Sequence, residues 1–540
     1  MFKILISTFL FFCVSLNPAY STFIKSQYIF DANNIRTNVW NTGVLFQDLS
    51  ANNTPGFEWP KFSGKNAIFT SGLSIACMIN GNLRMANATY NGEYAPGYVD
   101  VLQPLNPKFK TNSAFKLYKV KAGDTQTSNP DYANWGLMVP YGAPYEDVNN
   151  NGTFELNIDK PGVPGADQTI FVCITDADPS NHSSSEGFSG GTLPVFAEVH
   201  LTLWGYNLPN LENILFTRYE IINKSGRAWT NTHFGLFSDS HLGNPSDDYI
   251  GCDSALNLGY TYNAGNIDSS YGANPPAVGF RFLKTPLYKN EQLGMTAFNY
   301  MPSYNFLNEC LNDPSGSPLK ALNILRGFRT DNSGWLNPTT VPPYKTKYCF
   351  SGNPEDSSGW TEYKGIICRN GNLITSVPGN KRSMMVTGSD SLTVQPNKKF
   401  NIVFATVIER GSSNLNSVTK IKNLSNIAKI FYDNNFNYSD DDISFIQSIP
   451  EVSPVYSLSQ NYPNPFNPAT KIKFFIPENT FTSLKIYDVT GKEINTIVNE
   501  NLSRGEYEYL WNANNLPSGI YFYRLETESY TQTRKMILVK

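Results

Sequence analysis

The sequence predicts a mainly β protein: several antiparallel β-sandwiches with one amphipathic helix. Aromatic residues make up 14 % of the 540 residues against only 16 % charged residues, and 39 Gly and 34 Pro interrupt the chain. Such a composition suits short strands joined by turns and disfavours both long charged helices and disorder. Apolar runs of strand length, bounded by turn residues, are a further observation that favours this class.

The chain length and the charge balance limit the number of domains and the class of partner. At about 150 residues a domain, the length suggests three or four domains. The 42 Lys and Arg are balanced by 45 Asp and Glu, which gives a net charge of −3. Because neutralising phosphates needs an excess of basic residues, we expect no nucleic-acid partner.

Residues 1–21 have the pattern of a cleavable signal peptide. Lys3 supplies a positive charge, an apolar run covers residues 4–16, and the small residues Ala19 and Ser21 follow. A membrane-spanning helix needs about 20 apolar residues, and neither this run nor a later one reaches that length. We therefore expect an exported mature chain without a transmembrane segment.

The cysteines suit an exported chain but do not define its disulfides. Of seven cysteines, Cys13 falls in the signal peptide, and no CxxC pair occurs, which disfavours a zinc ribbon or a thioredoxin-like site. Cys349 and Cys368 are the nearest pair in the sequence. Buried free thiols are an equal alternative to bridges in a chain of this length.

The central region, residues 22–450, contains predicted strands and one predicted helix. The helix is expected over residues 415–431, where apolar residues recur every three positions and residues 412–414 offer capping side chains. The clearest strands cover residues 197–204, 215–222 and 400–409. We expect two or three β subdomains in this region, followed by a linker.

Residues 456–540 have the pattern of a small antiparallel β-sandwich. Apolar residues alternate with polar ones around residues 472–476, as in a half-buried strand, and further strands are expected near residues 484–486, 507–511, 520–525 and 536–539. The proline-rich stretch 462–468 lacks backbone donors and resists helix formation, so it should lie extended along the edge of the domain.

This C-terminal pattern resembles the type A sorting domain of type IX secretion cargo, which is immunoglobulin-like. The resemblance rests on residues 461–468, 486–492, 516–525 and 535–540. It implies export through the Sec route and the outer membrane, recognition by the type IX machinery, and removal of the domain, with the product released or attached to the surface. An immunoglobulin-like domain without a targeting role is the alternative. The sorting residues are then Asn461, Pro463, Asn464, Pro465, Phe466, Asn467, Pro468, Gly491, Gly519, Tyr521 and Lys535.

Parts of the central region, or passenger, also resemble uncharacterised exported proteins that carry the same domain. The matching blocks are residues 55–60, 162–169, 247–253 and 275–280. This second resemblance implies a common architecture and assigns no reaction.

The loop of residues 147–159 is a candidate calcium site. Calcium prefers oxygen ligands, and alternate side-chain oxygens followed by glycine can wrap such a cation. The position of Ile158 and the flanking Pro and Gly depart from an EF-hand, and an ordinary Asn-Gly turn is an equal alternative. The candidate ligands are Asp147, Asn149, Asn151, Thr153, Glu155 and Asp159.

A second, weaker candidate for calcium is an acidic stretch farther along the chain. Four carboxylates lie close together in the sequence and would repel one another unless water or a cation neutralises them. A solvated acidic loop is the simpler interpretation. The residues are Asp239, Asp247, Asp248 and Asp253.

The sequence supplies little evidence for catalysis. The GxSxG match at residues 187–191 lies between loop-forming residues instead of a strand and a helix. No HExxH motif, P-loop or dinucleotide fingerprint occurs, and only four His are available. We therefore assign no catalytic or cofactor-binding residue and leave open whether the passenger is an enzyme.

We expect the passenger to act at the cell surface or in the medium as a structural, adhesive or ligand-binding β protein with Ca²⁺ as its candidate cofactor. An extracellular glycan or protein is the expected ligand. The alternative is a secreted hydrolase that acts on polysaccharide or protein.

Overall fold

The computed structural model describes residues 24–48, 54–100, 112–183, 188–288, 291–302, 313–314, 316–368, 371–441, 456–503 and 505–540. The chain divides into two compact units, with the division after residue 446. The predicted signal peptide, residues 1–21, lies outside the described residues. Within the described residues, no helix combines the length and the apolar character that crossing a membrane requires.

Two large antiparallel sheets form the first unit. The first sheet has the strand order β1-β2-β5-β6-β15-β28-β23, with β7 beside β6. Its strands are β1 (Gln27–Phe30), β2 (Arg36–Trp40), β5 (Phe57–Glu58), β6 (Asn66–Ile79), β7 (Asn82–Asn87), β15 (Thr230–Ser240), β23 (Ala297–Pro302) and β28 (Lys381–Gly388).

The second sheet has the order β16-β17-β20-β29-β14-β13-β12-β8, with β9 beside β12. Its strands are β8 (Ala95–Pro96), β9 (Tyr118–Lys121), β12 (Gln168–Thr175), β13 (Ala197–Gly205), β14 (Ile214–Asn223), β16 (Asp248–Asp253), β17 (Leu258–Asn263), β20 (Ala277–Lys284) and β29 (Lys399–Glu409). The three strands predicted most clearly from the sequence are confirmed as β13, β14 and β29.

Two-stranded ribbons and short helical turns join these strands. The ribbons are β3 (Gln47–Asp48) with β4 (Thr54–Pro55), β10 (Tyr145–Glu146) with β11 (Lys160–Pro161), β18 (Ile267–Asp268) with β19 (Gly272–Ala273), β21 (Leu287–Tyr288) with β22 (Glu291–Gln292), β24 (Trp335–Asn337) with β25 (Tyr344–Thr346), and β26 (Ile366–Ile367) with β27 (Leu373–Ile374). The helical turns are α1 (Pro130–Ala133), η2 (Trp135–Leu137), η3 (Val139–Tyr141), η4 (Pro179–Asn181), η6 (Pro245–Asp247) and η7 (Glu362–Lys364).

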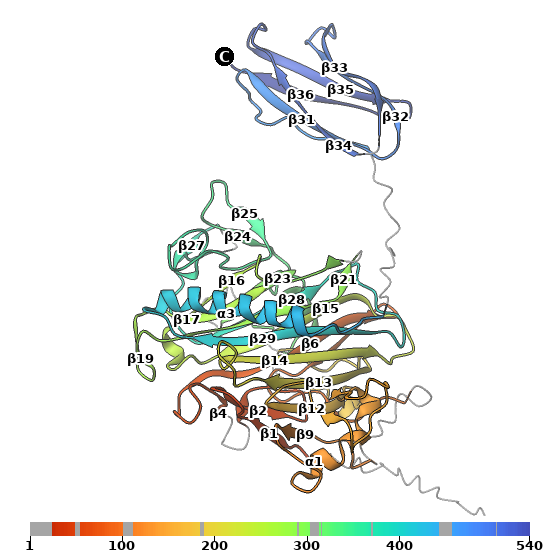
Figure 1. The fold of residues 1–540 in the computed structure, drawn as a ribbon. Helices are drawn as coiled ribbons and strands as arrows, with labels where there is room; N and C mark the ends of the chain where they lie inside the picture. The colour runs from red at the N-terminus through yellow and green to blue at the C-terminus, as the bar shows by residue number, and fades with distance from the viewer. Residues whose placement is uncertain are drawn as a thin grey trace, which may run out of the picture. The chain divides into compact units, whose positions relative to one another are not determined.

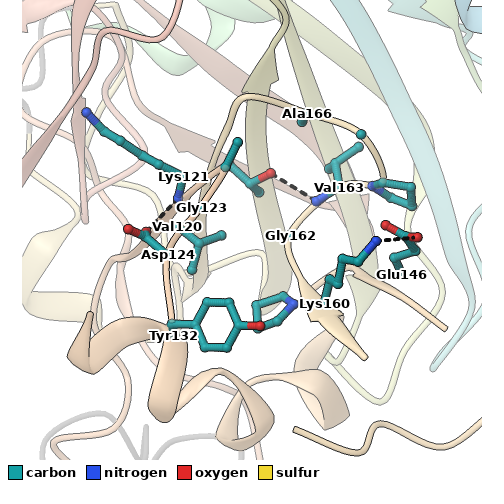
Figure 2. Close-up of a pocket in the computed structure, with 15 residues that line it drawn as sticks. Val120, Lys121, Gly123, Asp124, Tyr132, Glu146, Lys160, Gly162, Val163 and Ala166 are labelled. Carbon is teal, nitrogen blue, oxygen red and sulfur yellow. Dashed lines mark hydrogen bonds and ion pairs between the residues drawn. The ribbon is translucent and has the colours of Figure 1, made fainter. Parts of the chain in front are cut away.

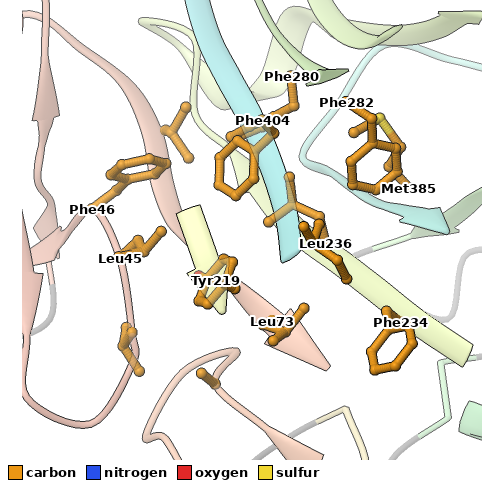
Figure 3. Close-up of a cluster of buried hydrophobic side chains, with 14 of the residues drawn as sticks. Leu45, Phe46, Leu73, Tyr219, Phe234, Leu236, Phe280, Phe282, Met385 and Phe404 are labelled. Carbon is orange, nitrogen blue, oxygen red and sulfur yellow. The ribbon is translucent and has the colours of Figure 1, made fainter. Parts of the chain in front are cut away.

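One hydrophobic core joins the two large sheets. Leu236 and Phe234 of β15 face Tyr219 of β14 and Phe404 of β29, as Figure 3 shows. Phe234 also packs against Phe400 in a tilted arrangement, with ring centroids 4.9 Å apart. Because each fully buried aromatic or aliphatic side chain contributes about 1.5–3 kcal/mol, this shared core binds the sheets into one sandwich. Strands that are distant in the sequence pair within each sheet, and the division of residues 22–450 into two or three subdomains stays a prediction.

The predicted helix is present as α3 (Asn414–Asn435) and is longer than expected at its C-terminal end. Ser413 caps it by accepting a hydrogen bond from the Asn416 N–H at 3.0 Å. The helix packs on β17, β20 and β29 of the second sheet (Figure 1).

The apolar stripe of this helix turns away from the sheet toward its C-terminus. Ile427 and Ile430 are 37 % and 62 % exposed, although the three-residue spacing placed them on the buried face. A helix turns once every 3.6 residues, so a row at three-residue spacing rotates steadily around it. Ala428 and Tyr432 take the buried positions instead.

The expectation of one helix missed α2 (Pro318–Leu325). Its buried residues Ala321, Ile324 and Leu325 pack against Phe237 and Met384 on the outer face of the first sheet. The helix is too short for its apolar period to stand out in a window of about 11–18 residues.

The second unit is a small antiparallel sandwich, as predicted. One sheet has the order β30-β31-β34 and the other β33-β32-β35-β36. Both sheets contribute to one core that includes Ile472, Leu484 and Tyr523. The strands are β30 (Ser457–Leu458), β31 (Ala469–Ile476), β32 (Thr480–Tyr487), β33 (Glu493–Leu502), β34 (Gly505–Asn512), β35 (Gly519–Thr527) and β36 (Thr531–Leu538).

Candidate functional site

The proline-rich segment of the second unit connects its two sheets. Tyr462 exchanges two main-chain hydrogen bonds with Lys471 of β31, at 3.0 and 2.9 Å. Four residues later, the Phe466 N–H donates to Ile537 O of β36 at 2.9 Å. The prolines at 463, 465 and 468 have no N–H to satisfy, so the extended segment bridges both sheets with few donors.

Three of the predicted sorting residues are buried in this unit, namely Asn461, Phe466 and Tyr521. The Asn461 N–H donates to Tyr523 Oη at 2.8 Å, and its amide donates to Pro463 O and Thr470 Oγ1 at 3.1 and 3.0 Å. Phe466 is buried beside Trp511, with ring centroids 5.6 Å apart. The side chains of Asn461 and Phe466 hold the segment in place and leave other groups to face the solvent.

Tyr521 belongs to strand β35, and the remaining sorting residues lie at turns or on the surface. Gly491 has a φ of +82° in the turn after Asp488, a conformation that strains residues with a side chain. The Tyr521 hydroxyl donates to Pro517 O at 2.8 Å, ahead of Gly519. Residues with exposed or half-buried side chains are Pro463, Asn464, Pro465, Asn467, Pro468 and Lys535.

In the first unit, the candidate calcium loop is the tip of the β10–β11 hairpin. The amides of Asn149 and Asn151 both donate to Glu155 Oε2, at 2.8 and 2.7 Å. Asp147 accepts the N–H groups of Asn151 and Gly152, at 3.2 and 2.7 Å. Gly152 has a φ of +73°, so its conformation favours glycine at this position. The loop therefore brings together four of the predicted ligand residues, Asp147, Asn149, Asn151 and Glu155.

Asp159 binds the backbone of the loop at two positions. Its two carboxylate oxygens accept the N–H groups of Val148 and Glu155, at 3.0 and 2.7 Å, and it is 2 % exposed. The Thr153 N–H donates to Asn151 Oδ1 at 2.8 Å. Asp159 thus supports the backbone at both ends of the loop, and the tip itself is exposed to solvent.

A cavity of about 270 Å³ adjoins the same hairpin. Figure 2 shows Lys160 and Glu146, paired at 3.0 Å across the stem, on one side of this cavity and Tyr132 and Asp124 on the other. Asp124 accepts hydrogen bonds from the Lys121 N–H and the Asn129 amide, both at 2.7 Å. The cavity therefore has a mixed lining, with one aromatic ring and two carboxylates that already have donors.

The four acidic residues of the second candidate do not converge on one point. Asp253 pairs with Lys422 of α3 at 3.0 Å, whereas Asp239 accepts a hydrogen bond from Tyr90 at 2.7 Å. Only Asp247 and Asp248 share a partner, the amide of Asn263, at 2.6 and 3.4 Å. Burial raises the pKa of Asp239 to about 6 and that of Asp248 well above its usual range.

A buried polar row that the sequence analysis missed crosses four strands of the second sheet. The register places Cys173 of β12 opposite His200 of β13, His200 opposite Glu220 of β14, and Glu220 opposite Asn401 of β29. Glu198 lies two residues before His200 and so on the same face. The available signal was polar residues at alternate positions in the otherwise apolar stretch 197–204.

Hydrogen bonds connect the members of this row. His200 Nδ1 lies 2.9 Å from Glu220 Oε1, and His200 Nε2 lies 3.2 Å from Glu198 Oε1. Arg218 pairs with Glu220. Burial alone would lower the pKa of His200, but its hydrogen bonds to Cys173 and to the two glutamates hold this pKa well above its ordinary value. Burial would raise the pKa of Glu220, yet His200 and Arg218 lower it to about 2.

The other three histidines lie in separate surroundings. His182 Nε2 lies 2.8 Å from Asp176 O, and although burial opposes it, Asp176 and Glu93 raise the pKa of His182 to about 9. His233 Nε2 lies 3.1 Å from Asp390. His241 lies 3.0 Å from the Asn380 amide, and burial lowers its pKa to about 4.

The described part of the GxSxG motif, residues 188–191, lies in a loop. Ser189 is buried, its Oγ lies 3.1 Å from Met85 Sδ, and residues 188–196 contain no helix or strand that would form a nucleophile elbow.

Cys349 is a free thiol and Cys368 is disulfide-bonded, so these two cysteines do not bridge each other. The other described free thiols are Cys77, Cys173 and Cys252, all buried.

Comparison with known proteins identifies the C-terminal region. Residues 460–540 match the family of secretion system C-terminal sorting domains. No curated protein matches the chain. A structure of dimeric latent PorU from Porphyromonas gingivalis is similar at 9 % identity and a TM-score of 0.14 over 69 % of this chain and 31 % of that chain. A structure of PorZ, a surface component of the type IX secretion system of the same organism, is similar at 10 % identity and a TM-score of 0.13, over 71 % and 52 %.

The chain thus spans about a third of the PorU chain and about half of the PorZ chain, and we draw no inference from either likeness. The sorting domain itself is sufficient for one conclusion. The chain is cargo of type IX secretion, and it is delivered to the cell surface or the medium. Its predicted sorting residues all lie within the matched range, 460–540.

Proposed function

We propose that the first unit is an extracellular ligand-binding module that Ca²⁺ stabilises through the loop of residues 147–159. The observation that carries this proposal is the convergence of Asp147, Asn149, Asn151 and Glu155 at the tip of the β10–β11 hairpin. Hard cations such as Ca²⁺ take about six to eight oxygen ligands at about 2.3–2.6 Å, and side chains at alternate positions before a glycine supply several of them.

The amides of Asn149 and Asn151 take the place of a cation beside Glu155. Both donate to the same carboxylate oxygen, so they supply the positive partner that Glu155 needs. If the side-chain amide group of each Asn rotates by half a turn, its oxygen takes the place of its nitrogen. The two residues then present two more ligand oxygens to an ion. Two Asn in place of Asp reduce the charge of the loop, so we expect a dissociation constant of about 10⁻⁴–10⁻³ M, as in other extracellular modules.

Calcium binding at this tip acts on the adjoining cavity because the two share the hairpin. β10 and β11 pair through Tyr145–Pro161 and Glu146–Lys160, and the second of these pairs lines the cavity. Fixing the tip restricts the stem and hence the spacing of the lining side chains. The cavity is near the lower limit of ligand pockets and suits one sugar ring or a short polar side chain, with Tyr132 as a stacking surface.

A secreted hydrolase is the alternative, and the cavity lining favours a binding module over it. Acid–base hydrolysis requires a carboxylate free to exchange a proton with the substrate. Asp124 already accepts two hydrogen bonds, and Glu146 is paired with Lys160. Both carboxylates are therefore engaged in contacts that stabilise the cavity wall.

Calorimetry of the purified protein tests the calcium site. With 5 mM Ca²⁺, we expect the melting temperature of the first unit to rise by about 2 °C relative to chelator, from mass action at the affinity above. Asp147→Asn should abolish the rise. Asp356→Asn is the matched control, because Asp356 also accepts hydrogen bonds in an exposed turn. An equal rise in Asp147→Asn, or none in the wild type, would refute the calcium site.

A glycan and peptide array, read with Ca²⁺ and with chelator, tests the binding module. We expect binding that Ca²⁺ strengthens and that Lys160→Ala weakens. Lys345→Ala, which removes an exposed lysine of β25, is the matched control. If the protein cleaves an arrayed glycan or peptide and does not stay bound to it, the result would favour the hydrolase instead.

A further inference from the structure

The buried polar row of the second sheet contains a set of side chains with the donor atoms of a transition-metal site. Cys173, Glu198 and His200 each offer one ligand atom, and these atoms lie within 4.8 Å of one another. Ligands on a tetrahedral zinc ion are separated by about 3.4–3.8 Å, given bond lengths of about 2.0–2.3 Å. Small side-chain movements therefore suffice to place an ion between them.

The register of the sheet fixes this geometry. Cys173 is directly opposite His200 in the β12–β13 ladder, and Glu198 precedes His200 by two residues on the same face. Cys173, Glu198 and His200 are 1 %, 4 % and 5 % exposed, so water competes little for these ligands. The cover is close: a Cβ at Gly142, where φ is +85°, would lie 2.3 Å from His200 Nδ1.

A second carboxylate orients the imidazole. His200 Nδ1 lies 2.9 Å from Glu220 Oε1, while Nε2 points to Glu198 at 3.2 Å. Metal-binding histidines usually donate their other ring N–H to a carboxylate, which fixes the tautomer and the ring orientation. Glu220 is itself held by Arg218, whose Nε donates to Asn401 Oδ1 at 2.6 Å.

We propose that Cys173, Glu198 and His200 bind a Zn²⁺-class divalent ion, with Glu220 as the positioning residue for His200. A thiolate, an imidazole and a carboxylate form a donor set suited to zinc and poorly suited to Ca²⁺, which prefers oxygen alone. Three protein ligands leave the fourth tetrahedral position to water or a small anion. This site is separate from the calcium loop, and neither proposal depends on the other.

The competing account is an ion-free cluster in which a protonated His200 bridges the two glutamates. Both ring nitrogens already face carboxylates, and Lys224 lies 4.0 Å from Glu198. The two accounts differ in the role of Cys173. A metal ion requires its thiolate, whereas the bridge between the glutamates does not.

The full-length protein, refolded with Zn²⁺ and freed of excess ion by gel filtration, distinguishes them. We expect the wild type to retain one more zinc per chain than Cys173→Ala or the nearly isosteric Glu198→Gln, as measured by elemental mass spectrometry. Cys77→Ala is the matched control, because Cys77 is equally buried and free in the first sheet. Circular dichroism and melting without metal establish that each variant folds.

Refolding with Co²⁺ supplies a spectroscopic test of the same ligands. A thiolate-to-metal charge-transfer band should be present in the wild type and in Cys77→Ala, and lost in Cys173→Ala. Glu220→Gln should keep the band and weaken the affinity by about 10–100-fold, as expected for an orienting group. Equal zinc in the wild type, Cys173→Ala and Glu198→Gln, or no band in the wild type, would overturn the proposal.

Discussion

The two units of the chain differ in where they place their charges. The first unit buries an ion pair between Glu362 and Lys381, whose side chains are 0 % and 4 % exposed and 2.9 Å apart. The described part of residues 456–540 buries no charged residue, and its ion pairs, such as Lys471 with Glu508 at 2.7 Å, lie at the surface.

Size explains much of this difference. A sandwich of about 85 residues has a thin core, because the fraction of surface that a chain buries rises with its length. A charge in such a core lies near water, and ion pairs stay at the surface, where they stabilise little. The larger first unit has room to enclose charges together with their partners. Its stability should therefore depend on individual partners and on pH far more than that of the second unit.

The largest effect should come from breaking the buried ion pair. Lys381→Met leaves Glu362 without its counter-ion and should lower the free energy of unfolding by about 3–5 kcal/mol. Calorimetry of the first unit measures it. The matched variant in the second unit is Lys485→Met, which breaks an exposed pair with Glu493. A comparable loss of free energy of unfolding in both variants would contradict the proposed difference between the two units.

His182 should make the first unit less stable at high pH. The pKa of His182 is raised to about 9, so its stabilising charge is present below pH 6.5 and lost as the pH rises to 9. The change amounts to about 3 kcal/mol for this buried side chain. Denaturant unfolding at pH 6 and pH 10 should show this loss in the wild type and not in His182→Gln. Parallel pH curves for the two proteins would exclude this role.

Asp239 should change the stability of the first unit over a lower pH range than His182 does. Burial raises the pKa of its carboxyl group from 3.8 to about 6. The folded state therefore binds the proton more tightly, and stability should fall by about 3 kcal/mol as the pH rises from 4 to 7. Asp239→Asn should remove this fall. Asp356→Asn, in an exposed turn, should retain the wild-type pH dependence, and its failure to do so would point to another group.

The smallest effect concerns the second unit. Asn461→Ala removes two hydrogen bonds from the buried amide and should lower the stability of that unit by about 1–3 kcal/mol. Asn467→Ala alters an exposed residue of the same segment and should leave the melting transition unchanged. If Asn467→Ala nevertheless abolishes export, the machinery recognises this surface and not only the folded domain.

The strands and the longest helix were predictable because their signals are local. The stretches at 197–204 and 400–409 have strand periodicity within a few residues, and β13 and β29 coincide with them closely. The short helix α2 and the end of α3 were missed, since a few apolar residues do not define a period. The Asp-Asn-Asn pattern of the candidate calcium loop is equally local, and it lies at the tip of the β10–β11 hairpin.

The sequence by itself determined the β class, the C-terminal sorting domain and the loop of residues 147–159, because each depends on residues that are neighbours in the chain. Only the tertiary structure decided that two large sheets share one core and that Cys173, His200 and Glu220 lie in line. The physical reason is strand pairing. A sheet brings together residues far apart in the sequence, and their register follows from the whole fold and not from any one segment.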